Sequence, residues 1–163
     1  MIKQVYDNLE QRLLAECRSY YGARLVSFCV YGSVGRRTMN PASDIDVLLV
    51  VDPLPDGRMR RVDEFSTVET KLRDDLAGAQ QKGVHAELSP VFKTPDEVHR
   101  GSLLFLDMLE DGRILFDKDR FLRTYFDSWA GKLKSLGAHR VHRGDSWYWV
   151  LKEPYLPGEV IEL

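Results

Sequence analysis

The stretch YGSVGRRTMNPASDIDVLLVV, residues 31–51, indicates both the fold and the chemistry of this chain. Ten residues separate Gly32-Ser33 from Asp44-Ile45-Asp46, and five apolar residues, Val47 to Val51, follow at once. A continuous apolar run of this kind predicts a strand that is buried on both faces. Residues two apart in a strand point to the same face, so Asp44 and Asp46 are predicted to direct both carboxylates to one place.

The paired carboxylates predict a metal site. Two like charges repel each other, and burying them without a partner is costly. A divalent cation removes this cost, and Mg²⁺ combines a few carboxylates with substrate phosphate oxygens. We therefore predict that Asp44 and Asp46 hold Mg²⁺ or Mn²⁺. The alternative is a solvated strand end with capping aspartates, and the Gly-Ser pair at this spacing favours the metal site.

The Gly-Ser pair predicts a phosphate contact. A glycine lets the backbone approach a phosphate closely, while the Ser33 hydroxyl and neighbouring N–H groups can hold its oxygens. If a short helix starts at Gly32, its free amides add a field that favours an anion. Arg36 and Arg37 are placed to reach further phosphate oxygens, because arginine suits bidentate contacts.

Nucleotidyl transfer calls for a third carboxylate, and Glu87 is the candidate. Charge accumulates on the attacked α-phosphate and on the leaving pyrophosphate, which two metals held by three carboxylates can stabilise. Glu87 lies between apolar neighbours in a strand predicted at 84–92. We predict that it is both a metal ligand and the base toward the acceptor hydroxyl, the alternative being an exposed strand residue. His85, on the same predicted face, is either a partner of Glu87 or a simple exposed histidine.

Hydrophobic periodicity and breakers predict strands that alternate with helices, which is typical of an α/β layer arrangement. Thr94-Pro95-Asp96-Glu97 is a strong helix start, with a hydroxyl cap, proline at the first position and glutamate at the third. We expect helices over about 2–21, 62–82, 95–111 and 121–133, and strands over about 24–31, 44–52, 84–92 and 113–116.

Length and composition set the class of protein. With 163 residues, 44% hydrophobic and 29% charged, the chain suits one globular domain, predicted at 1–137, followed by an arm over 138–163. The net charge of -2 argues against a general nucleic-acid binder. No apolar run approaches a membrane span and residues 1–20 lack a signal-peptide core, so a cytoplasmic location is expected. Cys17 and Cys29 are expected to be buried free thiols.

The motif resembles the glycine–serine, spacer and Asp-x-Asp pattern of the polymerase-beta-like nucleotidyltransferase superfamily. Without a large appended domain, the chain is similar to the minimal nucleotidyltransferases of bacteria and archaea. The resemblance implies a mixed sheet flanked by helices, an ATP-like substrate and Mg²⁺. It makes Asp44 and Asp46 metal ligands and assigns ATP contacts to four residues, which are Gly32, Ser33, Arg36 and Ser43. Glu87 stands where aspartate is commoner, and the tail extends beyond the minimal pattern.

The function implied is transfer of a nucleoside monophosphate, expected to be AMP from ATP, to a hydroxyl group. Minimal nucleotidyltransferases are often paired with a small helical HEPN-type ribonuclease toxin, and some adenylylate a tyrosine on it. The resemblance thus implies an antitoxin with a HEPN-type partner, while a small-molecule acceptor stays open. The rival hypothesis is a non-catalytic binding module that neutralises a partner by contact. Retention of all three carboxylates argues against this rival.

Overall fold

The computed structural model describes residues 1–162. They divide into two compact units, Met1–Leu122 and the residues from Arg123 onward. The first unit contains all the predicted site residues. Its centre is a four-stranded sheet in the order β3-β2-β1-β4. The strands are β1 (Leu25–Tyr31), β2 (Ile45–Val51), β3 (Leu88–Lys93) and β4 (Arg113–Asp117).

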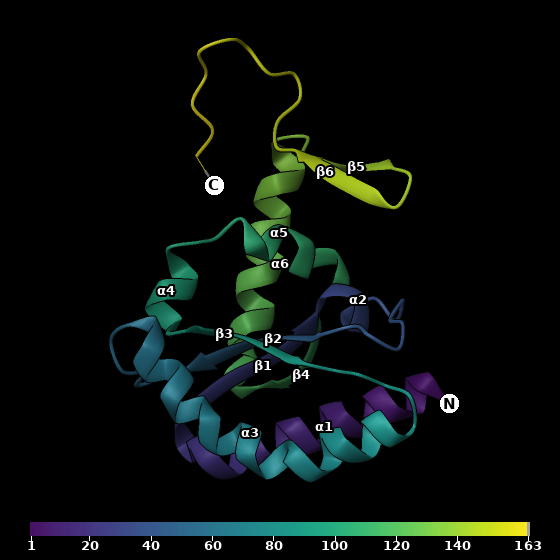
Figure 1. Cartoon of the computed structure of the whole chain (residues 1–163). Coiled ribbons are helices and arrows are strands. Elements are labelled where there is room, and N and C mark those ends of the chain that lie inside the picture. The colour runs from purple at the N-terminus through teal and green to yellow at the C-terminus, as the bar shows by residue number, and fades with distance from the viewer. Residues whose placement is uncertain (163) are drawn as a thin grey trace. The chain divides into compact units, whose positions relative to one another are not determined.

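The sheet is mixed. β1 pairs antiparallel with β2 and β4, whereas β2 pairs parallel with β3. Helices cover both faces, so the predicted mixed sheet flanked by helices is confirmed (Figure 1). The buried run after Asp46 is also confirmed, because Val47 to Val51 are all buried.

Two long helices, α1 (Ile2–Tyr21) and α3 (Arg58–Gln81), lie along one face of this sheet (Figure 1). Alternate β2 residues, Val47 and Leu49 among them, form the core with these helices. The apolar residues of α1 that were predicted to face the core, among them Leu9 and Leu13, are buried, and Gly22 caps the C-terminus of the helix. Buried Cys17 lies on its inner face, and burial raises the pKa of its thiol to about 12.

Short helices cover the other face: α2 (Gly32–Gly35), α4 (Pro95–His99) and α5 (Leu104–Asp111). The predicted capping box is present, since the Thr94 hydroxyl accepts from the Glu97 N–H and the Glu97 carboxylate accepts from the Thr94 N–H. The single helix expected over 95–111 is wrong, because it is interrupted after His99. Gly101 has a φ of 81°, a left-handed conformation that ends a helix and that glycine adopts without strain.

The boundaries of the strands also differ from the prediction in a way that matters for the site. β2 begins at Ile45 and β3 at Leu88, so Asp44 and Glu87 each lie one residue before a strand. The segment 84–87 has no regular secondary structure and precedes β3. Both residues therefore stand at the same end of the sheet, where the two parallel strands start.

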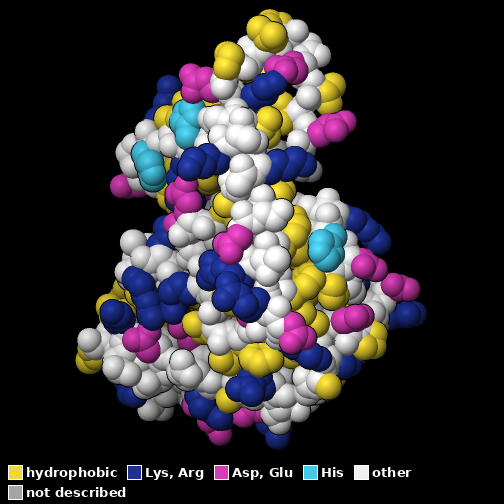
Figure 2. Space-filling model, turned by 180° about the vertical axis from the view of Figure 1, so that it is seen from behind, with side chains coloured by type: hydrophobic (Ala, Val, Ile, Leu, Met, Phe, Trp, Pro, Cys, Tyr) yellow, Lys and Arg dark blue, Asp and Glu magenta, His cyan; other side chains and the backbone are white. Residues whose placement is uncertain are grey.

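The second unit comprises most of α6 (Phe121–Ser135), a hairpin of β5 (His139–Arg143) and β6 (Ser146–Val150), and the residues that follow. The predicted arm therefore contains a hairpin, in which the Arg140 guanidinium carbon lies 4.8 Å from the Trp147 ring centroid. The domain boundary at residue 137 stays a prediction. Basic and acidic side chains are interspersed on the face shown in Figure 2. Over residues 1–162, no helix is long and apolar enough to cross a membrane.

Candidate functional site

The Gly-Ser turn and the Asp-x-Asp strand come together at the end of β1. Tyr31, the last residue of β1, pairs with Asp46 of β2, and α2 begins at the next residue, Gly32. Gly32 has a φ of 66°, and a Cβ at this position would lie 2.2 Å from the Asp46 Oδ2 atom. Only a glycine fits here, because both the backbone conformation and the neighbouring carboxylate exclude a side chain.

Asp46 is a partly buried carboxylate of this site. Its pKa is raised, first by burial and then by the negative charge of Asp44, while a hydrogen bond with the Ser89 side chain and the charge of Arg36 lower it. Burial beside a like charge is the situation that a bound cation relieves. This electrostatic environment supports the predicted metal ligation by the aspartate pair.

Asp44 and Glu87 are neighbours across the start of the two parallel strands. The Ile45 N–H donates to the Glu87 carbonyl at 2.8 Å, and the register pairs Ile45 with Leu88 and Asp46 with Ser89. Asp44 therefore stands opposite Glu87. Both side chains are exposed and line the same hollow.

The donor set fits a cation that is completed by substrate. Among residues 1–162, no group of three or more His, Cys, Asp or Glu side chains lies close enough to enclose a metal. Mg²⁺ is usually bound by one or two carboxylates together with substrate phosphates, and Asp44 with Asp46 provides such a pair. The roles of Asp44, Asp46 and Glu87 as metal ligands stay predictions.

The predicted phosphate contacts lie at and just after α2. Ser33 is partly exposed, and its carbonyl accepts from the Thr38 N–H at 2.9 Å, which closes the turn. The Arg36 guanidinium pairs with Asp111 at 3.2 Å, and its charge also acts on Asp46. The Arg37 side chain pairs with Asp7 on α1. Arg36 is thus held by Asp111 where its charge acts on Asp46, whereas the Arg37 side chain is bound to α1.

Ser43 has a contact within its own loop. Its hydroxyl is buried and accepts from the Asn40 N–H at 2.9 Å, and its carbonyl accepts from the Tyr6 hydroxyl at 2.7 Å. These bonds fix the segment that leads into Asp44. The predicted ATP contact of Ser43 therefore has to coexist with a structural role in the loop.

Sequence reasoning missed a second set of residues that fixes α2. Buried Glu10 of α1 pairs with Arg113 at the start of β4. The Arg113 guanidinium also donates to the carbonyl of Gly35 at 3.1 Å and to that of Val34 at 3.4 Å. One signal was available, since Glu10 follows Leu9 on the apolar face of a helix, where a carboxylate needs a partner.

Fold and site together place a Gly-Ser turn directly against a carboxylate pair at the end of a mixed sheet, the arrangement predicted for a nucleotide site. A family model described as "Nucleotidyltransferase domain" matches residues 10–114, which is more than half of the chain. The chain belongs to this nucleotidyltransferase domain family.

The individual proteins that this chain resembles have low sequence identity to it, 28% or less. The protein named "Putative protein adenylyltransferase MJ1305" from Methanocaldococcus jannaschii is 28% identical over 130 residues, covering 78% of this chain and 82% of that protein. A chain in the structure of a toxin–antitoxin with AMP-PNP has a TM-score of 0.47 and 14% identity, covering 78% of this chain and 92% of that chain. A chain in the complex of tri-AMPylated Shewanella oneidensis HEPN toxin with MNT antitoxin gives 0.46 and 13%, covering 80% and 90%.

Proposed function

We propose that this chain transfers AMP from Mg²⁺-bound ATP, or Mn²⁺-bound ATP, to a hydroxyl group of a protein. The observation that carries the proposal is the contact of Gly32 with Asp46, which places a phosphate-binding turn directly against a candidate metal ligand. The name of the 28% identical relative, a protein adenylyltransferase, supports AMP as the group and protein as the acceptor.

Each group of the site has a separate role in the transfer. The bound cation would neutralise charge on the triphosphate and on the departing pyrophosphate. The Ser33 hydroxyl and the α2 amides hold phosphate oxygens, and Arg36 adds positive charge on the same side. Glu87 accepts the proton of the acceptor hydroxyl as its oxygen bonds to the α-phosphorus. The bond from the α-phosphorus to the bridging oxygen breaks, and pyrophosphate leaves.

The acceptor protein is proposed to be a partner of the chain. By its resemblance to minimal nucleotidyltransferases, the chain is proposed to act as the antitoxin of a small helical HEPN-type protein, with a tyrosine as the acceptor. The chemistry of Glu87 requires only a hydroxyl with an abstractable proton. The charges on the chain give no general basis for binding nucleic acid, since its net charge is -2.

The position of the label distinguishes nucleotidyl transfer from its rivals. With Mg²⁺ present, ATP labelled at the α-phosphate should leave label on the acceptor protein, whereas γ-labelled ATP should release label as pyrophosphate. Transfer of the γ-label would indicate a kinase-like reaction. Binding of the partner without transfer of either label, by a chain that does bind Mg·ATP, would favour the non-catalytic binding module.

A further inference from the structure

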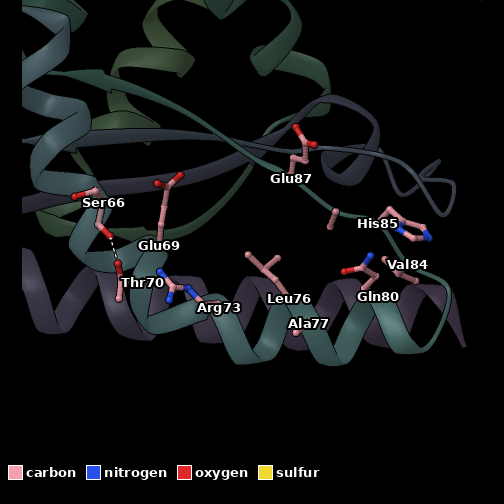
Figure 3. A pocket seen from close by; sticks show the side chains of 11 residues that line it. Ser66, Glu69, Thr70, Arg73, Leu76, Ala77, Gln80, Val84, His85 and Glu87 are labelled. Atoms are coloured by element: carbon pink, nitrogen blue, oxygen red, sulfur yellow. Dashed lines mark hydrogen bonds between the residues drawn. The ribbon is translucent and has the colours of Figure 1, made fainter.

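A groove made of neighbouring hollows runs along the segment 84–97, which contains β3, the edge strand of the sheet. Three hollows form it between α3 and the segment 84–97, and neighbouring hollows share lining residues. Figure 3 shows the residues that line the largest of the three. The middle hollow contains Asp44 and Glu87. It shares Glu69 and Glu87 with the largest hollow, of about 590 Å³, and Arg58 and Pro90 with the third. Two of the three candidate catalytic residues, Asp44 and Glu87, therefore line the groove, with a hollow on either side of them.

The lining of the groove is polar and charged along its length. In the largest hollow, Figure 3 shows Glu69 and Arg73 on α3 and Glu87 on the facing segment. These three side chains are exposed. Small-molecule sites are mostly apolar and enclose their ligand, so an open channel with charges of both signs suits a polypeptide better. β3 alone has six residues, or about 20 Å of extended chain, and the largest hollow lies beside residues 84–87, before β3. The groove can therefore take a segment of about six residues or more.

The edge itself is unsuited to pairing with an added strand. Pro90 lies within β3 and has no N–H to donate. The carbonyl of Phe92 already accepts from the Arg61 guanidinium at 3.3 Å, and Arg61 is held by a bidentate pair with Glu97 at 2.8 and 2.9 Å. Recognition in this groove therefore depends on side chains, not on continuation of the sheet.

We infer that this groove binds an extended segment of the acceptor protein and presents one of its hydroxyl side chains to Glu87. The inference rests on the proposed function and specifies how its acceptor is recognised. Residues of the bound segment on both sides of the hydroxyl contact the side of the groove that α3 forms. There Glu69 and Arg73 select the charges of the residues that flank the hydroxyl in that segment. Free small alcohols reach Glu87 but do not contact α3, so they gain no binding energy from that side of the groove.

The test uses a pool of eleven-residue peptides with a central tyrosine and randomised flanks, compared with N-acetyl-tyrosinamide, each with α-labelled ATP and Mg²⁺. A pool centred on phenylalanine controls for labelling elsewhere. The charge swap Glu69→Lys with Arg73→Glu alters the groove. The matched swap Asp63→Lys with Lys71→Glu alters exposed residues of the same helix that do not line the groove.

The wild-type chain should label the tyrosine pool at least about tenfold faster than N-acetyl-tyrosinamide at equal hydroxyl concentration. The groove swap should remove this advantage, or reverse the flank charges that are selected, with unchanged Mg·ATP affinity and unchanged labelling of N-acetyl-tyrosinamide. The matched swap should behave as wild type. Equal labelling of both acceptors, no labelling of the pool by a chain that binds Mg·ATP, or a groove swap that behaves as wild type would overturn the inference. Failure of the wild-type chain to bind Mg·ATP would instead overturn the proposed function.

Discussion

The carboxylate of Asp46 occupies the space into which a side chain at residue 32 would project. An ideal Cβ on Gly32 would lie 2.2 Å from Oδ2 and 3.1 Å from Cγ of Asp46. The turn predicted to hold the phosphate and the strand predicted to hold the metal are therefore in direct contact. Their relative position is sensitive to a single methyl group.

Gly32→Ala should lower both stability and nucleotide binding. The left-handed backbone alone costs a residue with a side chain about 1–2 kcal/mol, and the clash with Asp46 adds to this cost. Gly57→Ala is the matched control, because Gly57 has a φ of 85° and no atom within 4 Å of the added Cβ. Denaturant unfolding and Mg·ATP titration of both variants should show the larger loss for Gly32→Ala, with binding affected only there. Equal losses in the two variants would mean that the contact with Asp46 is unimportant.

Asp46→Asn should abolish transfer while the apo protein stays as stable as wild type or becomes more stable. Folding raises the pKa of Asp46, so its ionised form is disfavoured in the folded state, and this cost increases as the pH rises through the raised value. An amide has no such cost, but it binds Mg²⁺ poorly. Pyrophosphate release and melting curves measure the two effects.

Glu87→Gln is the companion variant. It should also lose transfer but keep more nucleotide binding, since the aspartate pair can still hold one metal ion. Turnover of Asp46→Asn at the wild-type rate would refute the catalytic assignment, and unfolding of that variant would make the carboxylate structural.

ATP should raise the melting temperature only when Mg²⁺ or Mn²⁺ is present. The aspartate pair and a bare triphosphate are all anionic and repel one another, whereas a ligand that binds only the folded state stabilises it. Thermal melting with ATP in Mg²⁺, in Mn²⁺ and in EDTA measures this dependence. A shift of the same size in EDTA would show that the nucleotide binds without a metal.

The two serines of the motif should differ. Ser33→Ala should weaken Mg·ATP binding by roughly 1–2 kcal/mol, the scale of one charge-assisted hydrogen bond. Ser43→Ala removes the acceptor for the Asn40 N–H, so it should lower the free energy of unfolding by about 1 kcal/mol, with a smaller loss of affinity. Calorimetric titration and denaturant unfolding separate the two quantities. A larger loss of affinity for Ser43→Ala than for Ser33→Ala would place the Ser43 hydroxyl on the nucleotide.

Arg113→Met should destabilise the chain by about 3–5 kcal/mol at neutral pH, because it leaves the carboxylate of Glu10 buried without its partner. Burial already raises the pKa of Glu10, and Arg113 lowers it. Without the guanidinium the pKa rises further, so the ionised carboxyl is costly at high pH, and protonation relieves that cost as the pH falls. The penalty should therefore be smaller at pH 5 than at pH 8. Arg12→Met, which removes an exposed pair with Asp75, should show a small and pH-insensitive change in the free energy of unfolding.

Local patterns in the sequence were sufficient for several elements. The apolar run after Asp46 predicted the central strand, because a strand covered on both faces needs apolar residues at every position. Thr94-Pro95-Asp96-Glu97 predicted the start of α4, because the capping contacts form within one turn. The same local reasoning failed at Gly101, where the strong helix start before it and the apolar stretch Leu103–Leu109 after it suggested one continuous helix.

What the sequence by itself determined was the set of groups available to the site: a glycine that can turn, a hydroxyl, and carboxylates at a strand's period of two. Only the tertiary structure decided which of these groups meet. The pairing of β1 with β2 brought Gly32 against Asp46, and the parallel register of β2 with β3 placed Glu87 opposite Asp44. Arg113 is even further from Glu10 in the chain, and their pairing depends on how α1 packs beside β4. Contacts between distant residues arise from the packing of whole elements, which local periodicity does not encode.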